Sequence, residues 1–401
     1  MKQGAWHQFG DRSQKLALEQ LQDGCGVGAI VSPRDLAFDK AKEYAPKYHE
    51  TGAEVLIDQQ FFLPESDVGK LRQWPCFNHR GRTSSLAGLS QGAIDALATS
   101  LEEENRGLKC AAILAPAVTY AAGRRDIAEL NSRLFSAARK AGDTIGVPTL
   151  ATVFLGDSAA ASYETITEAL SAATSLGASG WYFAFQFGDA RLPADDGEIL
   201  RYCAAALKLA ATGLPVLHGY AGPIAPVSLA TGATGVGVCH SQNTWGFSPS
   251  RWKDQSGGGG GGDAPPRFFS PRLWGTIVYP DEFARLPEEL LKQIVVHSAH
   301  SSAVSIRPPR AKWSRWDANK HLVATVCAES DALSQKSLSE RVSWVVTLLE
   351  GATSLHSEIA RLGVELNDHT ADYQQPWLDA VRRAGTVFKD EYEVVSLLAS
   401  L

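Results

Sequence analysis

The sequence has no apolar run close to the roughly 20 residues that a membrane-spanning helix requires, so we expect no membrane partner. The first 15 residues, MKQGAWHQFGDRSQK, lack the apolar core of a signal peptide, and a cytoplasmic protein is therefore expected. Six scattered cysteines form no CxxC pair, which predicts reduced, mostly buried thiols and argues against a structural zinc site. We expect no metal and no cofactor.

The sequence also has no excess of basic residues. Its formal net charge is −6 and its pI is about 6.0. This argues against a protein that coats nucleic acid indiscriminately, although a local basic groove remains compatible with it. The composition, 44% hydrophobic and 20% charged over 401 residues, is that of a globular protein with one large domain and an appendage.

What the sequence does contain is a repeated alternation of apolar strand-like runs and amphipathic helix-like stretches. Nearly continuous Val, Ile, Leu, Phe and Ala segments are typical of buried parallel strands. Seven such runs cover residues 26–33, 53–62, 109–120, 148–157, 179–189, 214–222 and 234–242. Helices are expected between them over residues 35–51, 90–104, 125–141, 163–176 and 196–212.

Seven strand–helix units in about 220 residues predict an α/β fold, a (β/α)8 TIM-like barrel, rather than an open sheet. Two segments, 274–280 and 321–326, compete for the eighth strand. We expect residues 1–25 to be an N-terminal extension and 26–330 to be the barrel, with a glycine-rich insertion near 254–266. Residues 331–401 are expected to form a C-terminal helical tail, because apolar residues recur there at three-four spacing.

Polar residues follow the expected strands at their carboxyl ends, where the chemistry of such barrels is placed. Asp58, which ends the run AEVLI, is the predicted catalytic carboxylate. Amides, imidazoles and aromatic rings around it would suit a planar ligand such as a nucleobase or a sugar. The predicted substrate-binding residues are Gln59, Gln60, Asp157, Gln186, Asp189, His218, Tyr220, His240, Gln242 and Trp245.

Structural roles are alternatives for each of these residues. Asp58 could cap the turn that follows it, and Asp157 and Asp189 are placed as helix caps would be. Gln186, an amide in an apolar run, requires a hydrogen-bond partner whether or not a ligand is present. The motif HSAH at 297–300 has the spacing of a metal pair, but no third ligand accompanies it, and loop histidines are the expected reading.

Two basic stretches stand out from the acidic background. One is FNHRGR at 77–82, and the other, RPPRAKWSRWDANKH at 307–321, interleaves cations with tryptophans. Cations contact phosphates and indole rings stack on bases, so these stretches predict DNA binding, and a solvated loop anchored by its tryptophans is the alternative. The predicted DNA-binding residues are His79, Arg80, Arg82, Arg307, Arg310, Lys312, Trp313, Arg315, Trp316 and Lys320.

Over residues 26–242 the chain resembles the tRNA-guanine transglycosylase superfamily, including its DNA-acting branch. The family's second strand ends in DSGG(F/Y)Q, where this chain reads DQQFF, so Asp58 carries over and the glycines do not. The segment LHGYAGPIAPVSLATGATGVGV resembles the family's sixth and seventh strand units in order and spacing. The resemblance implies a (β/α)8 barrel and a base pocket at Asp58.

The departures from the family are chemically informative. The family's strand-four Gln-Gly pair is replaced by FLGDS, its nucleophilic aspartate on strand seven is absent from GVGVCHSQN, and its zinc cluster is missing. Without the second carboxylate, hydrolysis is simpler than base exchange. The resemblance therefore implies a DNA glycosylase that flips out a modified base, with glucosylated hydroxymethylcytosine of phage DNA as the substrate that the DNA-acting branch suggests.

Three hypotheses remain open from the sequence. The first is this DNA N-glycosylase, which would leave abasic sites in phage DNA as an anti-phage defence. The second is a TIM-barrel enzyme acting on a small molecule. The third is a non-catalytic nucleic-acid-binding subunit of a DNA-modification or defence system. The sequence does not determine the oligomeric state.

Overall fold

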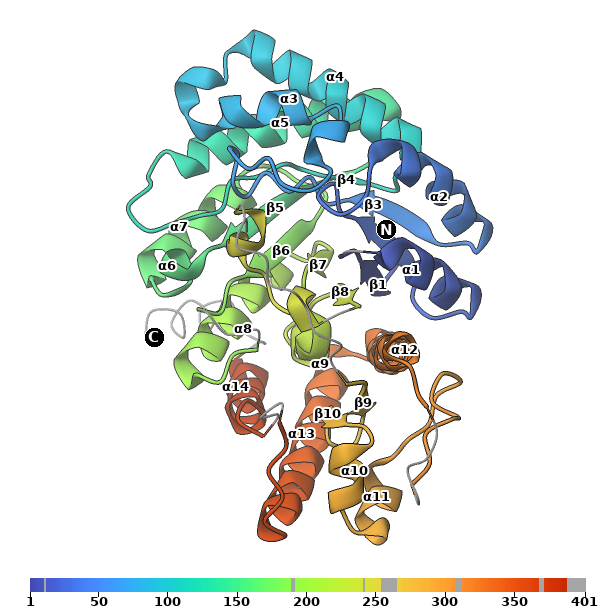
Figure 1. Ribbon diagram of the computed structural model, residues 1–401. Helices are drawn as coiled ribbons and strands as arrows, with labels where there is room; N and C mark the ends of the chain where they lie inside the picture. Colours follow the sequence, from blue (N-terminus) through green and yellow to red (C-terminus); the bar gives the residue numbers. More distant parts are fainter. Residues whose placement is uncertain are drawn as a thin grey trace.

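A computed structural model describes residues 1–10, 12–188, 192–240, 242–253, 265–306, 312–367 and 371–387. Eight parallel strands form a barrel with helices around it, which confirms the predicted fold class (Figure 1). The strands are β1 (Gly4–Gln8), β2 (Gly28–Val31), β3 (Glu54–Ile57), β4 (Ile113–Leu114), β5 (Thr149–Leu155), β6 (Trp181–Phe185), β7 (Val216–His218) and β8 (Gly235–Cys239).

The barrel closes through its first and last strands. The strands are ordered β3-β2-β1-β8-β7-β6-β5-β4, and β1 pairs with β8 along its whole length, from Gly4 opposite Gly235 to Gln8 opposite Cys239. At the remaining seam, the Ala111 amide before β4 donates to the Val55 carbonyl of β3 at 3.0 Å. Closure of this kind brings the carboxyl ends of all eight strands to one mouth.

The prediction for residues 1–25 was wrong, because this segment contains the first barrel strand, β1, and the first helix, α1 (Ser13–Gln22). The sequence GAWHQ lacks a continuous apolar run, since His7 and Gln8 are polar. All five residues are nevertheless buried, because these two side chains find hydrogen-bond partners inside the protein.

Neither segment that competed for the eighth strand is in the barrel. Residues 275–278 lie in an antiparallel hairpin of β9 (Arg267–Ser270) and β10 (Gly275–Val278), and residues 321–326 lie in helix α12 (Arg315–Ser334). Helix α12 packs against β1 and β8 and so takes the place of the eighth barrel helix. The boundary predicted between the barrel and the tail, at residue 330, is wrong, because this residue lies inside α12, which ends at Ser334.

The other helices around the barrel are α2 (Phe38–Glu50), α3 (Phe77–Arg80), α4 (Gln91–Leu108), α5 (Ile127–Ile145), α6 (Asp157–Ala160), α7 (Tyr163–Thr174), α8 (Asp196–Ala210) and α9 (Ala225–Ala230). The five expected helices are observed within a few residues of their predicted bounds, as α2, α4, α5, α7 and α8, whereas the short helices α3, α6 and α9 were not predicted. The polypeptide between β8 and α12 carries the β9–β10 hairpin, α10 (Asp281–Arg285) and α11 (Glu288–Ile294). The glycine tract of this insertion falls within 254–264, outside the described residues.

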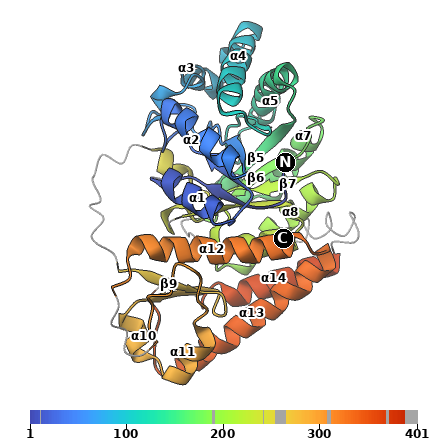
Figure 2. The same ribbon diagram turned by 90° about the vertical axis from the view of Figure 1, so that its right-hand side faces the viewer.

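The C-terminal helices α13 (Leu338–Arg361) and α14 (Gln374–Val387) pack on each other and on the barrel helices α8 and α9 (Figure 2). Helix α13 begins at a capping box in which the Ser337 amide donates to the Glu340 carboxylate at 2.8 Å. All six cysteines are unpaired and five of them are buried. Within the described residues, no helix combines the length and apolar character needed to span a bilayer.

Candidate functional site

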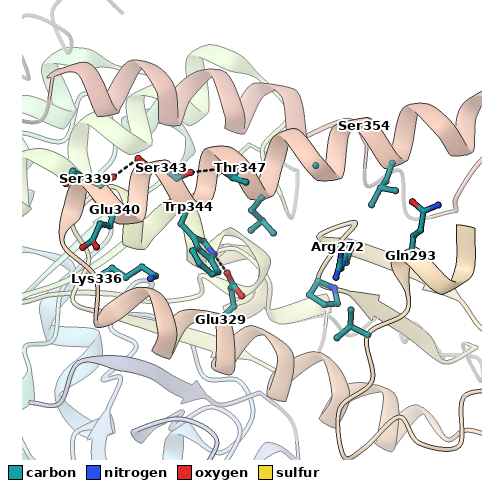
Figure 3. A pocket seen from close by; sticks show the side chains of 15 residues that line it. Arg272, Gln293, Glu329, Lys336, Ser339, Glu340, Ser343, Trp344, Thr347 and Ser354 are labelled. Atoms are coloured by element: carbon teal, nitrogen blue, oxygen red, sulfur yellow. Dashed lines mark hydrogen bonds between the residues drawn. The ribbon is translucent and has the colours of Figure 1, made fainter.

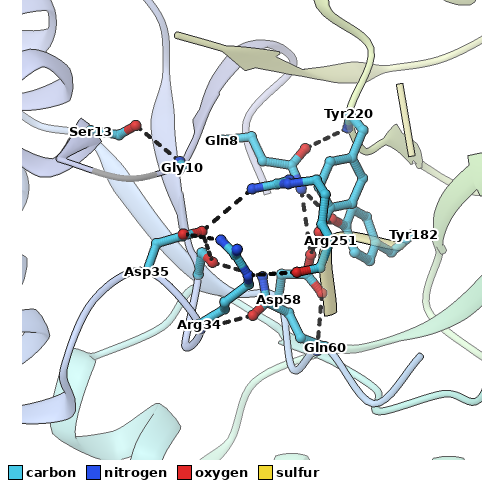
Figure 4. A network of polar contacts seen from close by, with 11 residues as sticks. Gln8, Gly10, Ser13, Arg34, Asp35, Asp58, Gln60, Tyr182, Tyr220 and Arg251 are labelled. Carbon is cyan, nitrogen blue, oxygen red and sulfur yellow. Dashed lines mark hydrogen bonds and ion pairs between the residues drawn. The ribbon is translucent and has the colours of Figure 1, made fainter. Parts of the chain in front are cut away.

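Asp58 follows β3 at the barrel mouth and is only 2% exposed. Its Oδ2 atom accepts hydrogen bonds from the Tyr220 hydroxyl at 2.5 Å and from the Tyr182 hydroxyl at 3.0 Å (Figure 4). Its Oδ1 atom accepts a hydrogen bond from the backbone N–H of Gln60 at 3.2 Å. Two phenols on β6 and after β7 thus fix the orientation of a carboxylate from the opposite side of the barrel.

Gln8 on β1 connects the two tyrosines to each other. Its Nε2 donates to the Tyr182 hydroxyl at 2.8 Å and lies 3.4 Å from Asp58 Oδ2, and its Oε1 accepts from the Tyr220 amide at 2.5 Å. Tyr220 has a φ of 58°, a left-handed conformation that is uncommon for a tyrosine and that this hydrogen bond holds in place. Sequence reasoning missed Gln8 because it assigned β1 to an extension.

Burial controls the electrostatics of this carboxylate. Desolvation raises the pKa of Asp58 from 3.8 to about 6, and the hydrogen bonds from Tyr220 and Tyr182 and the nearby charge of Arg251 oppose the rise. A carboxyl group with a pKa this near neutrality can take up and release a proton at physiological pH, as general acid–base catalysis requires.

Arg251 belongs to an ion-pair network that the sequence did not predict. Its guanidinium lies 3.7 Å from the Asp35 carboxylate, which also pairs with Arg34 at 2.6 Å. The Arg34 Nε donates to the Arg251 carbonyl at 2.9 Å, and the Ser66 hydroxyl donates to the next carbonyl, that of Trp252, at 2.5 Å. These contacts fasten the segment after β8 to the loops after β2 and β3.

The mouth above Asp58 is covered by an aromatic cap consisting of Phe62, Phe154, Tyr220, Phe247 and Trp252, all of them buried. The ring of Phe62 lies 4.5 Å from that of Trp252, and Phe247 stacks on Phe154 at 4.9 Å between centroids. Phe247 and Trp252 come from the segment that follows β8. Two of the five rings that cover Asp58 therefore come from residues 245–253.

The two glutamines that follow Asp58 in the sequence, Gln59 and Gln60, have different environments. Gln60 accepts from the Arg34 amide at 2.9 Å and donates to the Ser32 hydroxyl at 2.7 Å, so its side chain joins the loops after β2 and β3. Gln59 lies near Glu104, a buried carboxyl whose pKa burial raises to about 7, and the proximity of Gln59 opposes that rise. The Gln60 side chain is therefore held by the fold, whereas the buried Gln59 Nε2 atom has no hydrogen-bond partner among the described residues.

Two further predicted substrate residues pair with each other. The Gln186 Oε1 accepts from the Asp157 amide at 3.2 Å, and the Asp157 side chain is exposed at the start of α6. Gln186 therefore has the structural partner that a polar group in an apolar run requires. Asp189 lies outside the described residues.

His218 does not join the site, because it faces the helical layer outside the barrel. In the sheet register it lies beside Phe183, whereas its neighbour Leu217 lies beside Tyr182, which points to Asp58. The His218 Nδ1 contacts the Tyr202 hydroxyl of α8 at 2.8 Å. Burial lowers the pKa of His218 to about 3, so this imidazole is neutral at physiological pH.

The remaining predicted substrate residues gather in a second place. His240, Gln242 and Trp245 line a small cavity together with Arg315, one of the predicted DNA-binding residues. This cavity lies between the end of β8 and the start of α12, and Asp58 is not among its lining residues. The sequence-predicted set therefore divides between two sites.

Several predicted DNA-binding residues have structural contacts instead. Arg80 is buried and donates to the carbonyls of Gln59 and Leu63, at 3.3 and 3.0 Å, because the loop after β3 folds around it. Trp313 is buried and donates to the His300 carbonyl at 2.9 Å. These two residues are not available to DNA.

Three other predicted DNA-binding residues also contact the rest of the protein. Lys320 forms an ion pair with Glu19 at 2.5 Å, His79 contacts the Ser100 hydroxyl at 3.0 Å, and Trp316 packs against the core. Arg82, Lys312 and Arg315 are exposed, whereas Arg307 and Arg310 lie outside the described residues.

A larger groove of about 1040 Å³ lies away from the barrel mouth, between α12, α13 and the β9–β10 module (Figure 3). Trp344 is 43% exposed there, and its indole donates to Glu329. The Ser343 and Thr347 hydroxyls bond to carbonyls of their own helix. The charged residues of its described lining are Arg272, Glu329, Lys336 and Glu340.

The described residues contain no group of three or more His, Cys, Asp or Glu side chains that could hold a metal ion. In the HSAH motif, His297 contacts the Ser301 carbonyl at 3.0 Å and His300 contacts the Gln20 amide at 2.8 Å. Both histidines therefore make hydrogen bonds within the protein, as expected for loop histidines.

Replacing Tyr220 with phenylalanine should raise the pKa of Asp58 above about 6, because the variant loses the 2.5 Å hydrogen bond to the carboxylate. The measurement is an NMR titration of the Asp58 carboxyl carbon. Tyr120→Phe is the matched control, since this buried tyrosine interacts with Asn131 and not with Asp58. An unchanged or lower pKa in Tyr220→Phe would contradict the assigned contact.

Comparison with known proteins adds no family assignment: no family model matches the sequence, and no curated protein matches it significantly.

Proposed function

We propose that this chain is a hydrolase of N-glycosidic bonds, with Asp58 as its catalytic carboxylate and a modified base in DNA as its target. The observation that carries the proposal is the state of Asp58. It is a buried carboxyl group at the mouth of a parallel barrel, its pKa is raised to about 6, and two phenols and an amide fix its orientation. Enzymes of this architecture place their reacting groups at this end of the strands.

The chemistry follows from what an ionised carboxylate can do beside a sugar ring. As the bond between the anomeric carbon and the base nitrogen breaks, positive charge develops on the ring, and the Asp58 carboxylate stabilises it. Asp58 also accepts a proton from a water molecule, whose oxygen forms the new bond to the anomeric carbon. Asp58 then passes this proton to the departing base, which regenerates the carboxylate. The products are an abasic site and the free base.

Tyr182, Tyr220 and Gln8 are positioning residues in this scheme. Their hydrogen bonds hold Oδ2, and the Gln60 backbone amide holds Oδ1, so the orientation of the carboxylate is fixed before a substrate binds. The aromatic cap adds a water-excluding cover. Its outward movement would admit an everted base, and its return would strengthen the electrostatic interactions at Asp58.

A small-molecule substrate is the second candidate, and a specific observation favours it. Arg80, Trp313 and Lys320, which the sequence assigned to DNA, are used by the fold itself, and the cap closes the mouth tightly. On this reading a free nucleoside, not a base in DNA, would enter under the cap.

Base release decides between these candidates. The protein is incubated separately with DNA containing glucosylated hydroxymethylcytosine, with unmodified DNA, and with a panel of free nucleosides, and the abasic sites and released bases are quantified. We expect abasic sites in the modified DNA alone. Release from nucleosides only would support the small-molecule enzyme. DNA binding without any release would support a non-catalytic subunit and contradict the proposed hydrolase.

A further inference from the structure

The cavity at the end of β8 has an internal volume of about 60 Å³. This exceeds the roughly 10–15 Å³ that a single water molecule needs, so it has room for a small polar group. The described lining contains no aspartate or glutamate. Its residues are His240, Gln242, Trp245, Pro265, Arg267, Thr276, Arg315, Ala318, Asn319 and Leu322.

Two buried polar atoms of this lining have no hydrogen-bond partner, His240 Nδ1 and Trp245 Nε1. The two side chains are only 4% and 7% exposed. A buried polar group without a partner costs on the order of 1–3 kcal/mol, and such groups call for an unplaced ligand or water. Both side chains line the same cavity, and each would gain a hydrogen bond from a polar ligand placed against it.

The hydrogen-bond chain behind His240 determines what its free nitrogen can do. His7 Nε2 lies 2.8 Å from the Cys25 carbonyl, which can only accept, so this nitrogen carries a proton. His7 Nδ1 is then an acceptor, and it lies 3.1 Å from His240 Nε2, which must donate. The free Nδ1 of neutral His240 is therefore an acceptor that faces a missing donor.

The charged residues of the described lining are two arginines, Arg267 and Arg315. Arg315 is the first residue of the 20-residue helix α12, whose N-terminus carries partial positive charge, and it has no ion-pair partner among the described residues. Arg267, at the start of β9, adds a second guanidinium. His7 is the titratable group behind His240. With the Trp245 indole N–H, the cavity offers cations, one neutral donor and one acceptor.

We propose that this cavity binds the phosphate group of a phosphomonoester in its singly protonated form. The phosphate hydroxyl donates to His240 Nδ1, and the unprotonated oxygens accept from the Trp245 indole and the Arg315 guanidinium. A phosphodiester has no hydroxyl and would leave His240 without a partner. This inference is independent of the chemistry assigned to Asp58.

The pH dependence of binding follows from that proton. A phosphomonoester loses its last proton with a pKa of about 6, so its singly protonated fraction falls about tenfold per pH unit above that value. Burial and the neighbouring His7 hold the pKa of His240 well below its ordinary value, so His240 does not replace the lost proton. Affinity for a monoester should therefore fall steeply between pH 6 and pH 8.

Calorimetric titration of the whole chain with methyl phosphate, dimethyl phosphate and inorganic phosphate tests the proposal. We expect methyl phosphate to bind at pH 6 and to bind at least tenfold more weakly at pH 8. Inorganic phosphate, which keeps a hydroxyl at pH 8, should retain its affinity. Dimethyl phosphate should bind at least tenfold more weakly than methyl phosphate at pH 6, and equal binding of the two would overturn the monoester assignment.

Two variants locate the site. Arg315→Gln, on the exposed first turn of α12, should lose at least tenfold in methyl phosphate affinity at pH 6, and Trp245→Phe should lose affinity by removing only the indole N–H. Lys312→Gln is the matched control, because Lys312 is an exposed cation three residues away that does not line the cavity. Undiminished binding in Arg315→Gln, or no binding by the unaltered protein, would overturn the proposal.

Discussion

Replacing Asp58 with asparagine should stabilise the folded protein at pH 8 by about 3 kcal/mol. In the folded state burial raises the pKa of this carboxyl from 3.8 to about 6. The folded protein therefore binds the proton more tightly than the unfolded chain does. The penalty for the buried charge is absent below pH 4, grows as pH rises, and is complete above pH 6. Asparagine, which stays neutral, removes it.

The measurement is the free energy of unfolding in urea at pH 4 and pH 8 for both proteins. The gain from Asp58→Asn should be close to zero at pH 4 and should appear at pH 8. Asp157→Asn is the control, because the Asp157 carboxylate is exposed and its neutralisation should leave stability nearly unchanged. A variant that is less stable than the native chain at pH 8 would contradict the burial argument.

The same substitution should lower the rate of base release by roughly 10²–10⁴-fold, the range expected when a proton-transfer group is removed. A substitution that raises stability and lowers turnover is typical of a catalytic residue, because such a residue contributes to the reaction while it destabilises the folded state. Asp58→Asn with undiminished turnover would assign the reaction to another group.

Several buried imidazoles should destabilise this protein in acid, because they become charged when it unfolds, and the buried carboxyls of Asp58 and Glu104, whose pKa burial raises, oppose this effect. Burial lowers the pKa of His7 and His321 to about 4 and that of His218 to about 3. A histidine of this kind keeps its contribution above its unfolded pKa of 6.5 and loses it as pH falls toward the folded value. Each should lower the free energy of unfolding by about 2 kcal/mol between pH 7 and pH 5.

His218→Phe isolates one of these histidines. Its free energy of unfolding should fall by about 2 kcal/mol less than that of the native protein between pH 7 and pH 5. Tyr202→Phe is the matched control, since it removes the hydroxyl that contacts His218 but leaves the buried imidazole, and it should keep the acid sensitivity. An equal loss in His218→Phe and the native protein would show that His218 does not titrate on unfolding.

Much of the fold could be predicted from local patterns. The helix expected over residues 163–176 is observed as α7 (Tyr163–Thr174), and the run 179–189 contains β6, because side-chain periodicity is a property of neighbouring residues. The missed strand β1 shows where this reasoning fails. Its polar residues His7 and Gln8 are buried only because partners far away in the chain complete their hydrogen bonds.

The candidate site was predictable only in part, for a similar reason. Asp58 could be found because it ends an apolar strand, a local feature. Tyr182 lay inside an apolar run, and nothing in that run distinguishes the tyrosine that points into the barrel from the phenylalanine beside it. That distinction depends on strand register, since a shift of one residue exchanges the two faces of a strand.

The sequence by itself determined an alternating α/β chain, a barrel of parallel strands and an acid at the end of one of them. The tertiary structure decided which residues surround that acid, joining Gln8 to Tyr182 and Tyr220 across more than 170 residues of chain. It also turned His218 outward and placed an aromatic cap over the mouth. These outcomes depend on barrel closure and strand register, which bring distant residues together and cannot be predicted from the sequence pattern of any one segment.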